Sequence, residues 1–482
     1  MKWYFVLLLA VLVLIAVLIT VVLIRTAMFK PKKTEKKNYE EINFDKDKAV
    51  DSLRQLIRCK TVSDKDPEKE NLAEFDKLYE LLPVLYPNVF KTCSLTKLPG
   101  KALLFKWTGK KHENPAVLMA HYDVVSVVEE NWQKPPFEGI IEDGVLWGRG
   151  ALDTKVTFNG VLFSSDTLIG EGFVPENDIY FAFSGGEEIN GMGAVNIVNY
   201  FKEKNIKPYM VVDEGGAVVD NVFPGVKSPC GLIGIAEKGL MNLQYTVKSA
   251  GGHASAPLPH TPVGVLSKAC CKVENHPFKM HITKPVAEMF DTLGRKSTFA
   301  VKMIFANLWL FKGTLDRMCR KSGGELNALV RTTVAFTQME GSKGSNVIPP
   351  VSTMVSNIRI NPADTVDGVI AYINKTVGDE NVVLYDIESK NPSPVSYTDN
   401  EAYKRVADSV EGTWQGSIVS PYLMVQCSDS RHYGEISRSV YRFSAMDLTS
   451  DERKTIHGNN ERIRLTTAIK AVEFYIRLIK QC

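Results

Sequence analysis

The stretch AVLMAHYD, residues 116–123, carries an apolar run directly into a histidine and an aspartate. Its first five residues have the length and composition of a buried strand. Two more such runs, IYFAF at 179–183 and YMVV at 209–212, follow along the chain with helix-like stretches between them. This alternation predicts a mixed, mostly parallel α/β sheet. Because open α/β sheets place their sites at the carboxyl ends of strands, we expect the functional residues there.

The pattern changes after Gly239 to that of a second domain. Its expected strands and helices occur in the order βαββαβ, which predicts a ferredoxin-like two-layer domain with extra material at about 277–325. The expected strands are 241–248, 332–339, 353–360 and 382–388, and the expected helices lie near 262–274 and 364–376. The first rhythm resumes near 398. We therefore expect a large domain in two parts, 41–239 and 393–482, that is interrupted by an inserted domain at 240–392.

The N-terminus carries an uncharged apolar run from Trp3 to Ile24. A helix of this length spans about 30 Å, which is the thickness of the hydrocarbon core of a bilayer. We expect a transmembrane signal anchor at 3–24, followed by a polar, lysine-rich linker at 25–40. A cleaved signal peptide is the alternative, although its apolar region would be shorter and no small-residue cleavage site follows the run.

Composition narrows the classes of function. The 482 residues include 58 Lys and Arg and 55 Asp and Glu, for a net charge of +3. Residues 1–37 hold seven of the basic side chains and one acidic side chain, which leaves 51 basic and 54 acidic groups in the rest. A nucleic-acid binder would be far more basic, so that class is disfavoured. The eight cysteines form no CxxC pair and predict no disulfide framework, although one or two bridges stay open.

Five motifs gather acidic residues and histidines near the predicted strand ends. His121 and Asp123 alternate along a strand, so Asp123 can accept the free ring N–H of a ligating histidine. Asp153 lies at a glycine-rich turn, and its two carboxylate oxygens can bridge two cations. The other three motifs are SGGEE at 184–188, VVDEGG at 211–216 and TIHG at 455–458. One glutamate of the SGGEE pair can bind a metal while its neighbour acts as a general base on a bound water.

Together the motifs supply two histidines and three carboxylates as ligands. Nitrogen and oxygen donors without cysteine favour Zn²⁺, with Mn²⁺ or Co²⁺ as possible substitutes. A bridging carboxylate implies two ions about 3.5–4 Å apart.

These motifs resemble those of the co-catalytic zinc exopeptidase family that holds carboxypeptidase S, glutamate carboxypeptidase, carnosinase and aminoacylase. The resemblance spans about residues 45–480, and it is strongest to carboxypeptidase S and to a secreted enzyme that makes and cleaves N-fatty-acyl amino acids. It implies a zinc-peptidase domain with an inserted lid or dimerisation domain. It also implies a metallohydrolase that cleaves the amide bond to a C-terminal amino acid, as a carboxypeptidase or dipeptidase, or alternatively as an N-fatty-acyl amino acid hydrolase or synthase.

The family's roles transfer to matching positions of this chain. His121 and Asp213 would bind one zinc ion, Glu188 and His457 the other, and Asp153 would bridge them. Glu187 would be the general base, and Asp123 would orient His121. In the inserted domain, His253 of GHASAP (252–257) would polarise the scissile carbonyl group. Substrate-binding positions would be Arg359 in the NIR stretch, Asn346 in NVIP, and Asp429 and Arg431 in DSR.

Two positions depart from the family's pattern. Gly186 stands where relatives carry an aspartate before the glutamate pair, and Cys427-Ser428 stands where threonines are usual. Neither departure removes an expected ligand. A serine hydrolase is disfavoured because no GxSxG elbow is present, and a zincin because no HExxH is present. A membrane-tethered binding protein on the same scaffold is the non-enzymatic alternative.

Features of the sequence predict opposite sides of the membrane for the large domain. The lysine-rich flank after residue 24 favours a cytosolic domain by the positive-inside rule. The sequon Asn374-Lys375-Thr376 and the family resemblance favour the lumen of the secretory pathway or vacuole, or the cell exterior. We expect the lumenal or extracellular placement, with a small peptide or N-acyl amino acid as substrate and a possible homodimer through the inserted domain.

Overall fold

The large domain is built on an eight-stranded mixed sheet in the order β1-β2-β6-β3-β7-β16-β8-β15. The computed structural model describes residues 3–32, 37–223 and 225–482. Strand β3 pairs in parallel with β6 and β7, β7 with β16, and β8 with β15, so the predicted mostly parallel α/β class is confirmed. The strands are β1 (Ser94–Leu98), β2 (Ala102–Trp107), β3 (Lys111–His121), β6 (Asn177–Ser184), β7 (Met210–Val219), β8 (Cys230–Glu237), β15 (Ile418–Met424) and β16 (Val440–Leu448).

Both faces of this sheet are covered by helices. Side chains alternate along a strand, so Leu118 and Val212 face one layer while Val117 and Val211 face the other. This is why the central strands are continuously apolar in sequence. The helices of this domain are α2 (Lys46–Ile57), α3 (Leu72–Leu85), α4 (Pro87–Thr92), α5 (Lys155–Gly170), α6 (Gly193–Glu203), α13 (Glu401–Thr413), α14 (Ser450–Arg453) and α15 (Leu465–Ile479).

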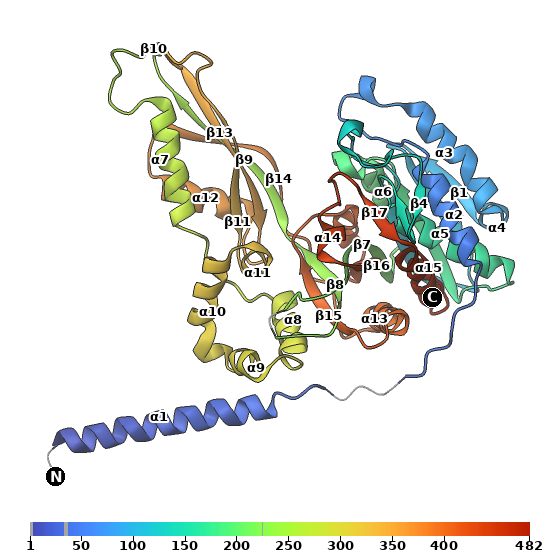
Figure 1. The fold of residues 1–482 in the computed structure, drawn as a ribbon, viewed down its shortest axis with the longest axis horizontal. Helices are drawn as coiled ribbons and strands as arrows, with labels where there is room; N and C mark the ends of the chain where they lie inside the picture. The colour runs from blue at the N-terminus through green and yellow to red at the C-terminus, as the bar shows by residue number, and fades with distance from the viewer. Residues whose placement is uncertain (1–2, 33–36, 224) are drawn as a thin grey trace.

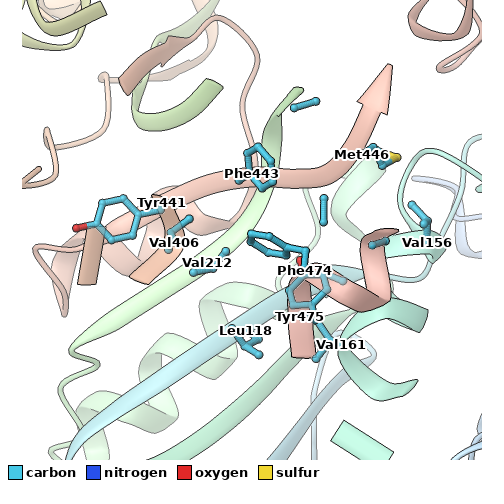
Figure 2. Close-up of a cluster of buried hydrophobic side chains, with 14 of the residues drawn as sticks. Leu118, Val156, Val161, Val212, Val406, Tyr441, Phe443, Met446, Phe474 and Tyr475 are labelled. Carbon is cyan, nitrogen blue, oxygen red and sulfur yellow. The ribbon is translucent and has the colours of Figure 1, made fainter. Parts of the chain in front are cut away.

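Helices α5 and α15 pack together under the middle of the sheet. Figure 2 shows Phe474 and Tyr475 of α15 between Val161 of α5 and the strand residues Leu118 and Val212. All of these side chains are buried. This packing holds the N-terminal end of α5, and the turn that comes directly before it, against the carboxyl edge of the sheet.

A small three-stranded sheet joins two distant segments of the chain. Its order is β17-β5-β4, formed by β4 (Ile140–Glu142), β5 (Val145–Trp147) and β17 (Arg462–Arg464). Arg462 pairs with Trp147, so the turn after β5 lies beside the loop that precedes β17. This places the segments around Asp153 and His457 side by side.

The inserted domain has the predicted βαββαβ order and its own hydrophobic core. Its antiparallel sheet runs β11-β13-β9-β14, with helices α7 and α12 packed on it. The elements are β9 (Gly239–Lys248), α7 (Pro262–Asn275), β11 (Thr333–Glu340), β13 (Val351–Ile360), α12 (Val366–Val377) and β14 (Val382–Lys390). A short pair, β10 (Gly252–His253) and β12 (Val347–Ile348), forms the end of this domain that lies farthest from the large domain (Figure 1).

The extra material near 277–325 folds into four helices that we call the helical insertion. They are α8 (Lys284–Gly294), α9 (Phe299–Ala306), α10 (Leu308–Ser322) and α11 (Gly324–Val330). Val286, Met289 and Phe290 of α8 belong to the core of the large domain, where α8 packs on β15. Although the expected boundaries assign this segment to the inserted domain, it therefore packs with the large domain.

Helix α1 (Trp3–Met28) projects from the body of the molecule beside α9 (Figure 1). It is long and apolar enough to cross a membrane, and almost none of it is buried within the chain. It continues four residues past Ile24, where the expected span ends. Residues 33–36 of the expected linker lie outside the described residues.

Candidate active site

Carboxylates and imidazoles converge at the carboxyl edge of the central sheet. His121 ends β3, and the Glu187–Glu188 pair follows β6 in a short 3₁₀ turn, η3 (Glu187–Ile189). Asp153 lies just before α5, and His457 follows α14. Asp153, Glu187, Glu188 and His457 all line one cavity of about 630 Å³.

Asp153 lies between the two histidines. Its Oδ1 is 3.0 Å from Nε2 of His121, and its Oδ2 is 3.0 Å from Nε2 of His457. The Nε2 atom of His457 is also 3.0 Å from Oε2 of Glu188. Each oxygen of Asp153 therefore faces a different set of donors, which is the arrangement expected of a carboxylate that bridges two cations.

Asp123 connects His121 to the glutamate pair. Nδ1 of His121 donates to the backbone carbonyl oxygen of Asp123 at 3.0 Å and lies 3.4 Å from its Oδ1, so Nε2 is directed towards the cavity. The buried Asp123 carboxylate also accepts the backbone N–H groups of Glu187 at 3.1 Å and Glu188 at 3.2 Å. Ser63 donates to the same carboxylate at 2.7 Å. Asp123 thus holds both the ring and the turn that carries the pair.

Strand β7 turns Glu214, rather than Asp213, towards His121. Oε1 of Glu214 lies 3.4 Å from Nε2 of His121, and Glu214 and Glu187 form a group with His121 that could hold a metal ion. The Asp213 carboxylate is buried behind it and accepts the backbone N–H of Ser430 at 2.9 Å. This differs from the expectation that Asp213 is a ligand, because adjacent residues of a strand point to opposite sides.

A buried ion pair ties the Asp153 turn to the His457 loop. Arg149 Nη1 is 2.6 Å from Glu461 Oε2, and Arg149 Nη2 donates to the carbonyl oxygen of Gly458 at 2.8 Å. Glu461 also accepts the backbone N–H groups of Leu152 at 2.7 Å and Asp153 at 3.1 Å. Arg149 belongs to the glycine-rich turn that was predicted to carry Asp153. No motif in the sequence predicted a role for Glu461.

Burial and like charge act on the carboxylates of the cavity. Burial raises the pKa of Glu187 well above its usual range, and nearby Asp429, Glu214 and Glu188 raise it further. Burial, with Asp153 and Asp213 nearby, raises the pKa of Glu214 to about 8. Hydrogen bonds to Asp153 and Glu188 raise the pKa of His457 to about 10. Crowding of carboxylates in this buried cavity therefore favours the uptake of protons, and a bound cation would take their place.

This donor set fits divalent metal ions. Five side chains offer two imidazole nitrogens and three carboxylates, the ligand types of catalytic zinc sites. They are His121, Asp153, Glu188, Glu214 and His457. Within the described residues, no lysine or arginine forms an ion pair with the three carboxylates. Cations would supply the missing positive charge.

The expected substrate-binding residues separate into two groups. Arg359, near the large-domain end of β13, donates to Sγ of Cys427 at 3.5 Å, and Cys427 lines the cavity. Asp429 accepts the hydroxyl group of Ser184 at the end of β6, and Arg431 donates to Oδ1 of Asn190 at 2.8 Å, just after the glutamate pair. These three lie around the cavity.

His253 and Asn346 lie together but apart from the cavity. The backbone N–H of Ala254 donates to the carbonyl oxygen of Asn346 at 2.9 Å, and Nδ1 of His253 lies 2.7 Å from the hydroxyl group of Ser255. His253 belongs to β10, at the far end of the inserted domain (Figure 1). Within one chain, the structure does not bring these two residues to the metal ligands.

A mixed α/β domain with this cluster at its strand ends, and with a separate inserted domain, defines a metal-dependent hydrolase. Comparison with known proteins agrees. Residues 117–481 match the model of peptidase family M20/M25/M40, and the chain belongs to this family. It is a hydrolase of the metallopeptidase and amidohydrolase type.

Two relatives with different names illustrate the similarity. The chain is 37% identical to N-fatty-acyl-amino acid synthase/hydrolase PM20D1 of Xenopus tropicalis, over 89% of this chain and 85% of the relative. It is 33% identical to probable carboxypeptidase S-like 2 of Dictyostelium discoideum, over 89% of this chain and 84% of the relative. In fold it is similar to an M20 family metallo-carboxypeptidase, Sso-CP2 from Sulfolobus solfataricus, with a TM-score of 0.65 and 18% identity over 90% of this chain and 98% of that one.

Proposed function

We propose that this chain uses two zinc ions to hydrolyse the amide bond between an acyl group and a C-terminal amino acid. The placement of Asp153 between His121 and His457 carries this proposal. His121 and Glu214 would hold one ion, and Glu188 and His457 the other, with Asp153 shared between them. Glu214 replaces Asp213 in this assignment because Oε1 of Glu214 lies 3.4 Å from Nε2 of His121, whereas the Asp213 carboxylate accepts the backbone N–H of Ser430.

Bound zinc ions lower the pKa of a coordinated water towards neutrality and polarise the substrate carbonyl group. Glu187 accepts the proton of the attacking water and then delivers it to the nitrogen of the leaving amine. The raised pKa of Glu187 suits this role, since it makes the carboxylate a stronger base towards the attacking water. Asp123 positions Glu187 by accepting its backbone N–H.

Arg359 supports recognition of a free carboxylate. Its guanidinium forms no ion pair with any acidic side chain in the described part of the chain, and its contact Cys427 lines the cavity. A planar guanidinium binds a carboxylate through two parallel hydrogen bonds. We assign it to the C-terminal carboxylate of the substrate, with Arg431 and Asp429 supporting the adjoining loop.

The cavity favours an apolar acyl group. Beside the carboxylates, its wall includes the apolar side chains Ala217, Val219, Leu232, Met424, Met446 and Leu448. About 630 Å³ is within the range of pockets that bind whole small molecules. Long-chain N-acyl amino acids are therefore our first candidate substrates, in line with the name of the Xenopus relative. Peptides with an apolar residue before the C-terminal one are the second, in line with the carboxypeptidase S-like relative.

His253 reaches the site in this proposal only through a movement of the inserted domain or from a second copy of the chain. The exposed position of β10 is consistent with either route. We propose a homodimer through the inserted domain, in which the histidine stabilises the oxyanion of the neighbouring site. Asn346, whose carbonyl oxygen accepts the N–H of Ala254, would accompany it.

We also propose that α1 is a retained membrane anchor and that the hydrolase domain lies in a lumen or outside the cell. The length and hydropathy of α1 support the anchor. Asn374 of the sequon is exposed on α12, where it would be accessible to glycosylation. Protease protection in sealed microsomes tests the side: a domain digested without detergent, and unglycosylated at Asn374, would place it in the cytosol.

The test of the hydrolase is a substrate panel on the full chain in nanodiscs with zinc. It compares N-palmitoyl amino acids and N-blocked dipeptides, each as free acid and as C-terminal amide. We expect the free acids to be cleaved and the amides to lose about 2–5 kcal/mol of transition-state binding, because Arg359 loses its charged partner.

The variant Glu187→Gln tests whether hydrolysis depends on the proposed general base. It should keep its zinc content and lose about 10²–10⁴-fold in turnover. Equal cleavage of acids and amides would overturn the role of Arg359. Full activity of Glu187→Gln would overturn the mechanism.

A further inference from the structure

The helical insertion exposes apolar and basic side chains beside the end of α1. Phe299 at the start of α9 is 60% exposed, and Trp309 near the start of α10 is 57% exposed. Residues 295–322 contain seven Lys and Arg and a single acidic residue, Asp316. Within the described residues, Lys302, Lys312 and Arg317 form no ion pair. We call Phe299, Trp309, Leu310, Lys302, Lys312 and Arg317 the α9–α10 surface.

Asn307 fastens this surface to α1. Its side chain is fully buried, and its Nδ2 donates to the carbonyl oxygen of Val22 at 3.3 Å and to Oγ1 of Thr26 at 3.2 Å. Arg25 of α1 returns hydrogen bonds to Oδ1 of Asn307 at 3.2 Å and to the carbonyl oxygen of Ala306 at 3.1 Å. The junction between α9 and α10 is thus bonded to the last two turns of α1.

A second set of contacts follows where α1 ends. The guanidinium of Arg295 lies 4.4 Å from the centre of the Phe29 ring and donates to the carbonyl oxygen of Lys30 at 2.9 Å. Lys32 lies 3.3 Å from Oδ2 of Asp291 on α8. Contacts on both α9 and α8 fix the exit of α1 against the helical insertion, so the two cannot be placed independently of each other.

These contacts set the depth of the α9–α10 surface. If α1 spans the bilayer, its apolar run ends at Ile24, so Val22 to Thr26 lie where hydrocarbon gives way to headgroups. Trp309 is two residues from Asn307, and consecutive Cα atoms are about 3.8 Å apart, so Trp309 lies at a similar level. Tryptophan, phenylalanine and leucine with nearby lysines are the side chains that enter this interfacial layer.

We propose that the α9–α10 surface docks on the phospholipid headgroup layer of the bilayer that α1 spans. Phe299, Trp309 and Leu310 insert among the headgroups, and Lys302, Lys312 and Arg317 contact lipid phosphates and carboxylates. The inference rests on the membrane-spanning role proposed for α1. It does not depend on which amide the site hydrolyses.

Docking in this way connects the bilayer to the cavity. The helix α11, which directly follows α10, carries Glu325, and Glu325 lines the cavity. Its carboxylate accepts the hydroxyl group of Tyr422 at 2.9 Å and pairs with Arg453 at 3.2 Å, and both partners also line the cavity. The surface therefore brings the cavity wall close to the layer in which a long-chain acyl amino acid dissolves.

Fluorescence quenching tests the docking. The full chain is placed in nanodiscs of phosphatidylcholine with phosphatidylserine and a lipid that carries a quencher near the headgroup. Trp309→Phe should remove a quenchable part of the tryptophan emission, whereas Trp147→Phe, on β5 of the large domain, should not. Lys302→Glu with Lys312→Glu should lower the quenching of Trp309, since each basic residue near an anionic surface contributes roughly five-fold in binding.

The outcomes separate this inference from the proposals on which it rests. Equal quenching of the wild type and Trp309→Phe, with Trp3 quenched, would show that α1 inserts and the surface does not dock. If Trp3 is not quenched either, the membrane-spanning role fails and the docking fails with it, while hydrolysis of the substrate panel is unaffected. Cross-links between the α9–α10 surfaces of two chains would assign the surface to a dimer interface and overturn the proposal.

Discussion

Asp153 has two carboxylate oxygens, and each lies 3.0 Å from the Nε2 atom of a different histidine. Glu214 completes the His121 side and Glu188 the His457 side. Asp213 instead holds the loop that carries Ser430. The two acidic residues of β7 therefore have different roles. Glu214 contributes a carboxylate beside His121, and Asp213 positions the loop that carries Ser430.

The first prediction separates Glu214 from Asp213 by metal content. Glu214→Ala should leave about one zinc ion per chain after dialysis, because one of the two ions loses a carboxylate ligand. Asp213→Asn should keep both ions, since an asparagine can still accept the N–H of Ser430. Elemental analysis of the purified variants gives the answer. A loss of zinc in Asp213→Asn with full zinc in Glu214→Ala would restore the assignment made from sequence.

Sequence reasoning found most of the candidate site at the residue scale. His121 and Glu188 each stand in a motif at a predicted strand end, and strand ends of a parallel sheet meet at one edge. Asp153 stands in a glycine-rich turn, and the role of His457 came from the family resemblance. The choice between Asp213 and Glu214 was not decidable, because two adjacent carboxylates offer the same chemistry. Glu461 was beyond reach for another reason: its role depends on which backbone N–H groups the fold brings to it.

At the scale of elements, the Asp153 turn and the His457 loop depend on one buried ion pair. Arg149 and Glu461 are both almost fully buried, and Glu461 accepts N–H groups from the turn while Arg149 donates to the loop. Strands β5 and β17 bring the two segments together, and this pair then sets their spacing.

Breaking this pair should destabilise the protein strongly. Arg149→Met leaves the Glu461 carboxylate buried without its cation, which costs about 3–5 kcal/mol of unfolding free energy. The matched control is Lys202→Met, whose exposed pair with Glu435 should contribute less than about 1 kcal/mol. Urea unfolding of both variants measures the difference. Equal losses would contradict the role of the pair.

A second prediction at this scale concerns acid sensitivity. His432 is half-buried in the turn after β15, where burial, Arg431 and Lys390 lower its pKa to about 4 from an unfolded value near 6.5. Between these values the unfolded chain binds the proton and the folded chain does not, so stability falls as the pH is lowered from 6.5 to 4. His432→Gln should reduce the loss of unfolding free energy between pH 7 and pH 5 by about 1–2 kcal/mol in urea titrations. An unchanged pH dependence would exclude this residue as its source.

Elements were predictable to different degrees. Strands β3, β6 and β7 of the large domain and the four long strands of the inserted domain follow apolar runs whose length and alternation identify them, whereas β1, β2, β8, β15 and β16 were not predicted individually. The sequence pattern does not predict helices α8 to α11, because their apolar residues are divided between the core of the large domain, the contact with α1 and an exposed surface. No single period describes a helix that meets three environments.

At the scale of the whole molecule, the inserted domain carries His253 away from the metal ligands (Figure 1). Sequence alone predicted this histidine as part of the site but could not place it, since the relation between two domains depends on contacts that no local pattern encodes. The position of β10 leaves two routes to a complete site: closure within one chain, or assembly with a second copy. These routes make different predictions for mixtures of inactive chains.

The last prediction is that two inactive variants restore activity when they are mixed as dimers. Glu187→Gln lacks the base but has His253, and His253→Ala has the base but lacks the histidine. If His253 acts across a dimer, the site that keeps Glu187 receives its histidine from the Glu187→Gln chain. Random exchange makes half of the dimers mixed, with one working site in each, so we expect about a quarter of the wild-type rate. If the mixture is no more active than its components, either His253 serves its own chain through domain closure or no dimer forms, and sedimentation of the wild type distinguishes these two cases.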